Sequence, residues 1–184
     1  MSRFAAALVL SLAFVTAAHA KEKEGVQIPD TVEVDGKTLK LNGAGVRTKI
    51  FFKVYVAGLY LENTTKSAQE AITSDQTKRV TLVMLRDLDK NQVSDAIREG
   101  FQKNSGPNLA AVKDRLDKLS GMFSNVKTGQ QMILTYVPGK GTTVSVNGAE
   151  KGTIEGKDFN DALLAVWLGK QPVDEDCKKG MLGQ

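Results

Sequence analysis

The sequence predicts an α+β fold, in which helices pack on one side of an antiparallel sheet. Two features indicate this fold. Strand-forming segments occur in runs joined by short turns, and amphipathic helical segments are grouped between and after these runs. Hydrophobic residues make up 41% of the chain and charged residues 25%, which is ordinary for a soluble globular protein. We therefore expect one domain, spanning residues 21–184.

The first 20 residues have the pattern of a secretory signal peptide, which we expect to be removed after Ala20. Arg3 provides the positive charge, Ala5 to Val15 the apolar stretch, and Ala18-His19-Ala20 a small-x-small cleavage site. The apolar stretch is shorter than the roughly 20 residues that cross a membrane, although an uncleaved anchor is the alternative. The sequence thus predicts an exported protein, periplasmic in a bacterium, with no stable membrane span after cleavage.

Cleavage would also remove His19, the only histidine of the chain. The mature protein would then have no imidazole for a Ser-His-Asp or Cys-His system, or for a His-ligated zinc or haem site. Cys177 is the only cysteine, so no intramolecular disulfide is expected. A buried, inert thiol is predicted there, with a reactive or intermolecular thiol as the alternative. Acidic clusters are better explained as helix N-termini than as metal ligands, and we expect no cofactor.

The formal net charge of +4 is spread along the chain. There is no basic run and no alternation of basic and aromatic residues, so we expect no nucleic-acid partner. The charge leaves open a weak attraction to anionic lipid surfaces. Nothing in the sequence indicates the oligomeric state.

The N-terminal third of the domain is predicted to consist mostly of strands. Residues 21–25, KEKEG, are interpreted as a solvated leader, and residues 26–43 as a hairpin whose Asp35-Gly36 pair suits a type I′ turn. From Val46 to Leu61, β-branched and aromatic residues predict one long strand of roughly 50 Å.

The glycines before this strand and the alternation within it are its most informative features. Gly43 and Gly45 allow the backbone to adopt positive φ or to pack closely against another segment. Even-numbered positions of the strand are almost wholly apolar, and odd-numbered positions are mixed. Because successive residues point to opposite faces, Arg47 and Tyr55 are expected to share the mixed face.

Two helices are predicted in the middle of the chain, separated by a strand at residues 78–85. Ser67 and Asp89 are their expected N-caps, because Glu70 and Gln92 stand at the capping-box position three residues later. Apolar residues at helical spacing define the buried stripes of the second helix and of a third that Asn108 can cap: Val93, Ile97 and Phe101, then Leu109, Val112, Leu116, Leu119 and Phe123.

The C-terminal part is predicted to contain three strands followed by two helices. Pro-Gly-Lys-Gly and Asn-Gly turns divide residues 131–154 into the three strands. Asp158 is the expected cap of an apolar helix that ends at Gly169. A last short helix is expected from about Val173 to Met181.

The segment GAGVRTKIFFKVYVAGLYLE, residues 43–62, resembles chalcone isomerase and its non-catalytic relatives. In that family, a Gly-Ala-Gly-x-Arg turn precedes a Phe-x-Lys-Phe-x-x-x-Gly-x-Tyr-Leu-Glu strand. The tail FNDALLAVWLGKQPVDEDCKKGMLG, residues 159–183, is similar to the C-terminal helices of the bacterial members. The resemblance implies an open-faced β-sandwich, a long-stranded sheet covered by a helical layer with a cleft between the two.

The resemblance places the cleft arginine of the family on Arg47, which from the residues alone is interpreted as a surface arginine paired with an acid. In the enzyme, a phenolate oxygen of the substrate attacks an enone while the arginine, a tyrosine, a threonine and an asparagine complete the site. Here the strand threonine falls on Tyr55, the tyrosine and asparagine on Val93 and about Gly100, and the C-terminal threonine has no counterpart. Because catalysis needs several placed groups, no catalytic residue is assigned.

We therefore expect a non-catalytic binder of a small apolar anion such as a fatty acid, since relatives in this family bind fatty acids. Arg47 would hold the carboxylate, Tyr55 would assist, and the acyl chain would occupy the cleft. Two alternatives remain open: an isomerase of the intramolecular lyase type acting on an enone, and an envelope scaffold or partner-binding protein.

Overall fold

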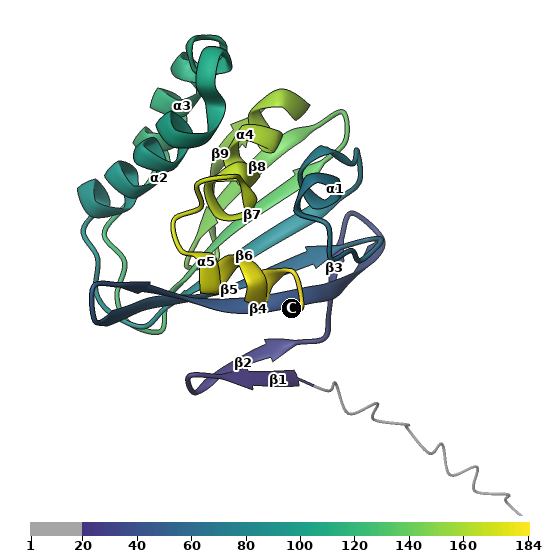
Figure 1. The fold of residues 1–184 in the computed structure, drawn as a ribbon, viewed down its shortest axis with the longest axis vertical. Helices are drawn as coiled ribbons and strands as arrows, with labels where there is room; N and C mark the ends of the chain where they lie inside the picture. Colours follow the sequence, from purple (N-terminus) through teal and green to yellow (C-terminus); the bar gives the residue numbers. More distant parts are fainter. Residues whose placement is uncertain (1–19) are drawn as a thin grey trace, which may run out of the picture.

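The structure is a computed structural model that describes residues 20–184 (Figure 1). Apart from Ala20, the predicted signal peptide lies outside these residues, and so does His19. None of the helices between Ala20 and Gln184 has the length and apolar character that crossing a membrane requires.

The centre of the fold is a seven-stranded antiparallel sheet in which each strand pairs with the next one along the chain. Its strands, in spatial and chain order, are β3 (Thr31–Val34), β4 (Lys37–Lys49), β5 (Phe52–Leu61), β6 (Lys78–Met84), β7 (Gln131–Val137), β8 (Gly141–Val146) and β9 (Ala149–Ile154). This simple order confirms the predicted α+β fold, because helices only interrupt or follow the meander.

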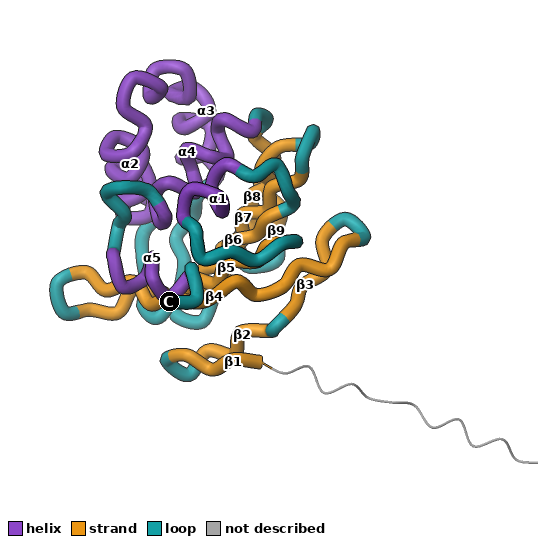
Figure 2. The backbone as a smooth tube through the Cα atoms, turned by 45° about the vertical axis from the view of Figure 1, so that its right-hand side comes forward, coloured by secondary structure: helices purple, strands orange, loops and turns teal. Residues whose placement is uncertain are grey.

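The helices gather on one side of the sheet (Figures 1 and 2). They are α1 (Ala68–Thr73), α2 (Lys90–Ser105), α3 (Leu109–Met122), α4 (Lys157–Leu168) and α5 (Glu175–Met181), with a 3₁₀ turn at Gly106–Asn108 between α2 and α3. The larger hydrophobic core lies between this layer and the sheet, and includes Phe101, Phe159 and Trp167. The cleft side of the fold is therefore the helical side.

The opposite face of the sheet carries a smaller core that is covered by the hairpin of β1 (Ala20–Lys23) and β2 (Val26–Pro29). Ile28 of this hairpin packs with Val56 and Tyr60 of the sheet. The interpretation of residues 21–25 as a solvated leader is thus wrong. Lys21 and Glu22 do face solvent, but Lys23 donates a hydrogen bond to the carbonyl oxygen of Ala44, and the backbone pairs with β2. This pairing leaves no hydrophobic signal in the sequence.

The predicted single strand from Val46 to Leu61 is wrong as well, because Ile50 and Phe51 form a turn between β4 and β5. Ile50 has a φ of 61°, a conformation that β-branched residues rarely adopt. The usual Gly and Asn turn residues are missing, so the segment looks like a continuous strand. Arg47 and Tyr55 nevertheless share a face as predicted, since they are directly paired across the two strands.

Most of the predicted local signals are confirmed. Asp35 and Gly36 both have positive φ in the turn between β3 and β4, Ser67 caps α1, and Asp89 caps α2 in a full capping box with Gln92. The expected cap at Asp158 is wrong, because the N-cap of α4 is Gly156, two residues earlier. Asp158 instead accepts hydrogen bonds from the guanidinium of Arg115 on α3. Asn108 precedes α3 but makes no side-chain capping hydrogen bond.

Gly43 and Gly45 allow α5 to lie directly on β4. Neither has positive φ, so the close-packing interpretation of these glycines is the correct one. A Cβ atom on Gly43 would lie 2.3 Å from the carbonyl oxygen of Gly180, and one on Gly45 would overlap the backbone of Cys177. Any larger residue would push α5 away from the strand that carries Arg47.

We expect Gly45→Ala to destabilise the protein by about 1–3 kcal/mol or more, because the added methyl meets backbone atoms that cannot move aside. Gly121→Ala is the matched control, since a Cβ there meets nothing within 4 Å. Urea unfolding of both variants measures the difference. Equal stability of the two variants would contradict the packing role of Gly45.

Glu62, which follows the end of β5, joins that strand to the starts of β4 and β6. Its Oε1 atom accepts a hydrogen bond from the backbone N–H of Thr77 over 2.6 Å and another from Lys37 Nζ over 2.9 Å. Hydrogen bonds from Thr77 and Lys37 lower the pKa of Glu62 from 4.5 to about 2. The carboxylate therefore stabilises the fold above pH 4.5, and this contribution is lost as the pH falls toward 2.

We expect Glu62→Gln to be less stable than the unmodified protein at pH 7, by about 1 kcal/mol for this partly exposed group. The two unfolding free energies should converge as the pH falls from 4.5 to 2, because the carboxylate becomes protonated there. Urea titrations across this range measure the convergence. Glu150→Gln, which removes the charge of an exposed carboxylate on β9, is the matched control. Unfolding free energies of Glu62→Gln and the unmodified protein that do not converge would contradict this role of Glu62.

Candidate functional site

A cavity of about 290 Å³ lies between the sheet and the helical layer. The strands β4 to β7 form one wall, and α2 and α4 form the other. The interior is apolar and buried, and its lining includes Val54, Leu82, Met84, Val93, Ile97, Met132 and Val166. The lining residues that reach the surface are mostly polar or charged, and include Lys49, Arg86, Gln92, Asp95 and Glu99. The cavity thus has an apolar interior and a charged mouth.

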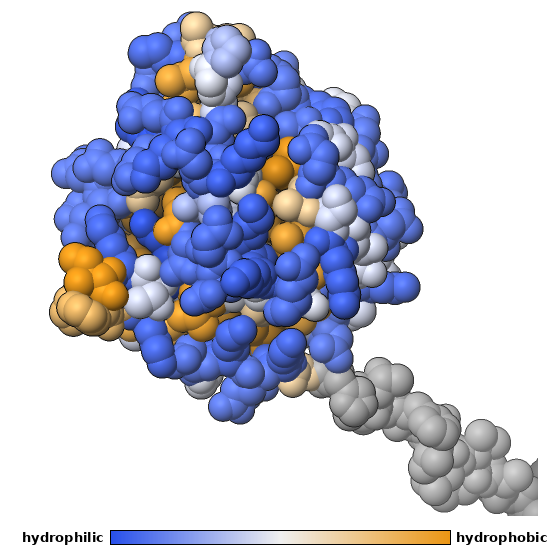
Figure 3. Space-filling model, viewed as in Figure 1, coloured by the Kyte–Doolittle hydropathy of each residue, from blue (hydrophilic) through white to orange (hydrophobic). Residues whose placement is uncertain are grey.

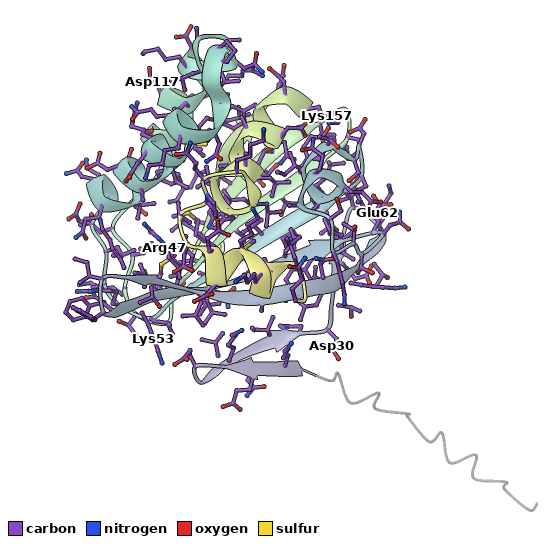
Figure 4. The ribbon with its side chains drawn as sticks, viewed as in Figure 1. Asp30, Arg47, Lys53, Glu62, Asp117 and Lys157 are labelled. Atoms are coloured by element: carbon purple, nitrogen blue, oxygen red, sulfur yellow. The ribbon has the colours of Figure 1, made fainter. Side chains whose placement is uncertain are left out.

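Arg47 projects from β4 into the region between the hairpin and the helices (Figure 4). Its Nε atom is buried and makes no hydrogen bond, and its guanidinium forms no ion pair with any acid between Ala20 and Gln184. The guanidinium carbon lies 5.5 Å from the centroid of the Tyr55 ring, a cation–π distance. Arg47 is therefore not the acid-paired surface arginine that the residues alone suggest.

Tyr55 is buried beside Arg47 and is held by Trp167 of α4. The indole Nε1–H donates a hydrogen bond to the Tyr55 hydroxyl over 2.8 Å. Burial raises the pKa of Tyr55 well above its ordinary value, so the phenol is neutral and keeps its proton. Since the oxygen already accepts from Trp167, the O–H hydrogen is available to a group in the cavity.

The charges at the mouth are mixed in sign. Hydrogen bonding to Lys103 lowers the pKa of Glu99, and the positive charges of Lys49 and Arg47 act in the same direction. Glu99 is therefore ionised at neutral pH, but it is exposed and bonded to Lys103. The mouth contains no buried carboxylate among the residues that line it.

Cys177 lies behind Arg47 on α5 and does not line the cavity. It is a free, buried thiol whose hydrogen points to the Sδ atom of Met181, 4.0 Å away. Burial raises the pKa of Cys177 to about 12, so the thiolate is scarce at neutral pH. This confirms the prediction of a buried thiol.

Val93 and Gly100, the positions on which the resemblance to chalcone isomerase places a tyrosine and an asparagine, bring no polar side chain into the cavity. Val93 lines it with an apolar surface, and Gly100 packs against Val166 instead. Val173, between α4 and α5, also contributes an apolar side chain to the lining. In residues 20–184, no group of three or more His, Cys, Asp or Glu side chains is placed to hold a metal ion.

Trp167 is the functional residue that sequence reasoning missed. It falls on the apolar stripe of a predicted helix, where a tryptophan is expected to be part of the core. Its polar N–H was the available signal, because a buried indole normally needs an acceptor. The hydrophobic pattern does not reveal that this acceptor is Tyr55, 112 residues earlier in the chain.

Comparison with known proteins gives two similarities. A family model described as chalcone isomerase-like matches residues 20–183. Among solved structures, the crystal structure of a fatty-acid binding protein from Arabidopsis thaliana aligns with a TM-score of 0.70, over 89% of this chain and 95% of that one. The two sequences are 16% identical, so this likeness shows a shared fold. No curated protein matches the sequence.

We expect Tyr55→Phe to destabilise the ligand-free protein by roughly 1–3 kcal/mol, because the buried Trp167 N–H loses its acceptor. Tyr60→Phe is the matched control: Tyr60 is equally buried, on the other face of the sheet, and its hydroxyl bonds to no other residue between Ala20 and Gln184. Urea unfolding measures both variants. A loss no greater in Tyr55→Phe than in Tyr60→Phe would contradict the role of the hydrogen bond.

Proposed function

The chain belongs to the chalcone isomerase-like family, and from this premise we propose that it is a non-catalytic binder of a small anionic amphiphile of the fatty-acid type. The carboxylate would lie between Arg47 and Tyr55, and the acyl chain would fill the apolar interior of the cavity. The protein would act after export, in the periplasm of a bacterium, a location supported by the signal-like residues 1–20.

The buried Nε–H of Arg47, which has no hydrogen-bond partner in a guanidinium without an ion pair, is the observation that carries this proposal. A buried N–H without a partner is costly, and the positive charge next to an apolar cavity adds to that cost. An anion in the cavity would remove both penalties. Arginine presents several N–H groups in one plane, which matches the two oxygens of a carboxylate.

Tyr55 supports a carboxylate over other anions of the same charge. Its free O–H hydrogen provides one more donor beside the guanidinium, and Trp167 fixes the direction of the hydroxyl. Two rigid neighbouring donors suit a planar group with two acceptor oxygens. The apolar interior then selects a ligand with a hydrocarbon tail.

The volume of the cavity limits the size of that tail. Ligand pockets usually measure about 300–1,000 Å³, so 290 Å³ lies at the lower end of the range. We therefore expect short and medium acyl chains to be enclosed fully, and longer chains to extend through the mouth. The fatty-acid binding of the Arabidopsis thaliana protein with the same fold is consistent with this class of ligand.

The proposal excludes catalysis because the cavity offers no proton acceptor beside Arg47. The phenol of Tyr55 is held neutral, the thiol of Cys177 lies outside, and the carboxylates of Asp95 and Glu99 are exposed at the mouth. Two hydrogen-bond donors can bind an anion in its ground state, but they offer little extra binding to a transition state.

We expect Arg47→Gln to weaken the binding of medium-chain fatty acids by about 10- to 100-fold, which is the usual value of a hydrogen bond to a charged group. Binding of the corresponding fatty alcohols, which have the same tail and no charge, should change much less. Calorimetry or displacement of a fluorescent acyl probe, together with native mass spectrometry of the purified protein, measures both.

Arg98→Gln is the matched control, because Arg98 is an arginine of α2 that pairs with Asp117 and does not line the cavity. It should bind fatty acids as the unmodified protein does. If Arg47→Gln binds fatty acids as tightly as the unmodified protein does, the proposal is refuted. Turnover of a chalcone or another enone that is lost in Arg47→Gln would favour an isomerase instead.

A further inference from the structure

The turn between β4 and β5 exposes three large apolar side chains. Ile50 is 77% exposed, Phe51 90% and Phe52 59%, and no other large hydrophobic residue between Ala20 and Gln184 is as exposed. In the space-filling view, orange and tan atoms protrude at the left edge of the molecule (Figure 3), where Figure 1 places the end of the hairpin of β4 and β5. We call Ile50, Phe51 and Phe52 the hairpin tip.

Basic residues surround the hairpin tip. Lys49 and Lys53 flank it in the sequence, and the guanidinium of Arg86 lies 4.8 Å from the centroid of the Phe52 ring. Lys53 is paired with Glu24, whereas Lys49 and Arg86 form no ion pair with another residue of the described chain. An apolar projection between cationic side chains is the pattern of a segment that enters the interface of an anionic bilayer.

From these features we infer that the hairpin tip inserts into anionic lipid bilayers and docks the mouth of the cavity on the membrane surface. Phe51 would enter the acyl region, while Lys49 and Arg86 would contact lipid phosphates. Asp95 and Glu99 at the mouth oppose the cations, so the electrostatic part is modest and apolar insertion provides most of the affinity.

The shape and size of the hairpin tip favour a bilayer over a protein partner. Each partner in a stable protein complex contributes about 800 Å². Aromatic side chains bury roughly 150–250 Å² each, so Phe51, Phe52 and the smaller Ile50 together provide less than that. A narrow convex projection also offers a second protein no complementary surface, whereas a bilayer closes around it.

The hairpin tip is continuous with the cavity, because Ile50 and Phe52 belong to its lining while Phe51 does not. This arrangement separates the two functions experimentally. Phe51 can be changed without altering a residue of the proposed ligand site, and docking can be measured on lipid-free protein. The inference therefore stands or fails independently of the proposed function.

The test is flotation of the lipid-free exported protein with two kinds of vesicle, phosphatidylcholine alone and a mixture with phosphatidylglycerol. We expect the unmodified protein to float with the mixed vesicles, and Phe51→Ser to bind them at least about tenfold more weakly. Phe51→Trp should still bind, and brominated acyl chains should quench its fluorescence. Quenching of the unmodified protein should be weak, since Trp167 is buried.

Two lysine variants test the electrostatic part with a matched change of net charge. Lys49→Gln should weaken binding to the mixed vesicles, whereas Lys151→Gln on β9 should not. Phe51→Ser should also bind soluble fatty acids as the unmodified protein does.

Three results would overturn the inference. The first is equal flotation of Phe51→Ser and the unmodified protein, and the second is that neither protein floats with mixed vesicles. The third is a change of oligomeric state in Phe51→Ser, in sedimentation velocity, without a change in vesicle binding, which would make the hairpin tip a contact between copies of this chain.

Discussion

The register between β4 and β5 is the constraint on which the site depends. It places Arg47 opposite Tyr55, brings Gly45 under α5, and ends in the turn at Ile50 and Phe51. A slip of one residue along either strand would send its side chains to the opposite face of the sheet. Arg47 would then point away from the cavity and the two donors would separate. The packing of α5 on Gly43 and Gly45 opposes such a slip, because only these positions of β4 leave room for the helix backbone.

The surroundings of Arg47 differ from those of an arginine in a structural ion pair. In a structural pair, the acid is provided by the fold and the guanidinium is satisfied in the resting protein. Here the fold provides an aromatic face and a neutral hydroxyl, neither of which compensates a full charge. The remaining interaction energy is available to an incoming anion. A carboxylate provided by the fold beside Arg47 would occupy the place that we propose for the ligand.

The sequence was sufficient for the fold class, most element boundaries and the shared face of Arg47 and Tyr55, because each depends on local patterns such as caps, alternation and glycine spacing. It was insufficient where tertiary structure overrode those patterns. Ile50 adopts a turn conformation that favours Gly or Asn, so no local signal marks the end of β4. Residues 20–23 pair with β2 through their backbone, and their mostly charged side chains show no apolar alternation that would predict a strand. Trp167 and Tyr55 meet only after the sheet and α4 have packed, which no spacing in the chain encodes.

The unusual turn also connects the two proposals. An isoleucine at positive φ costs of order 1–3 kcal/mol, and a two-residue turn of Asn and Gly would avoid that cost. Strain of this kind persists where a side chain has another role, and the apolar surface of Ile50 is such a role, since it belongs to both the hairpin tip and the cavity lining. The half-buried Arg47 lies close to the mouth, so a bound amphiphile would have its carboxylate near the surface and its tail inside. A lipid that leaves a bilayer for this position must move its tail past the mouth, where Ile50 and Phe52 would keep that tail in contact with apolar surface throughout.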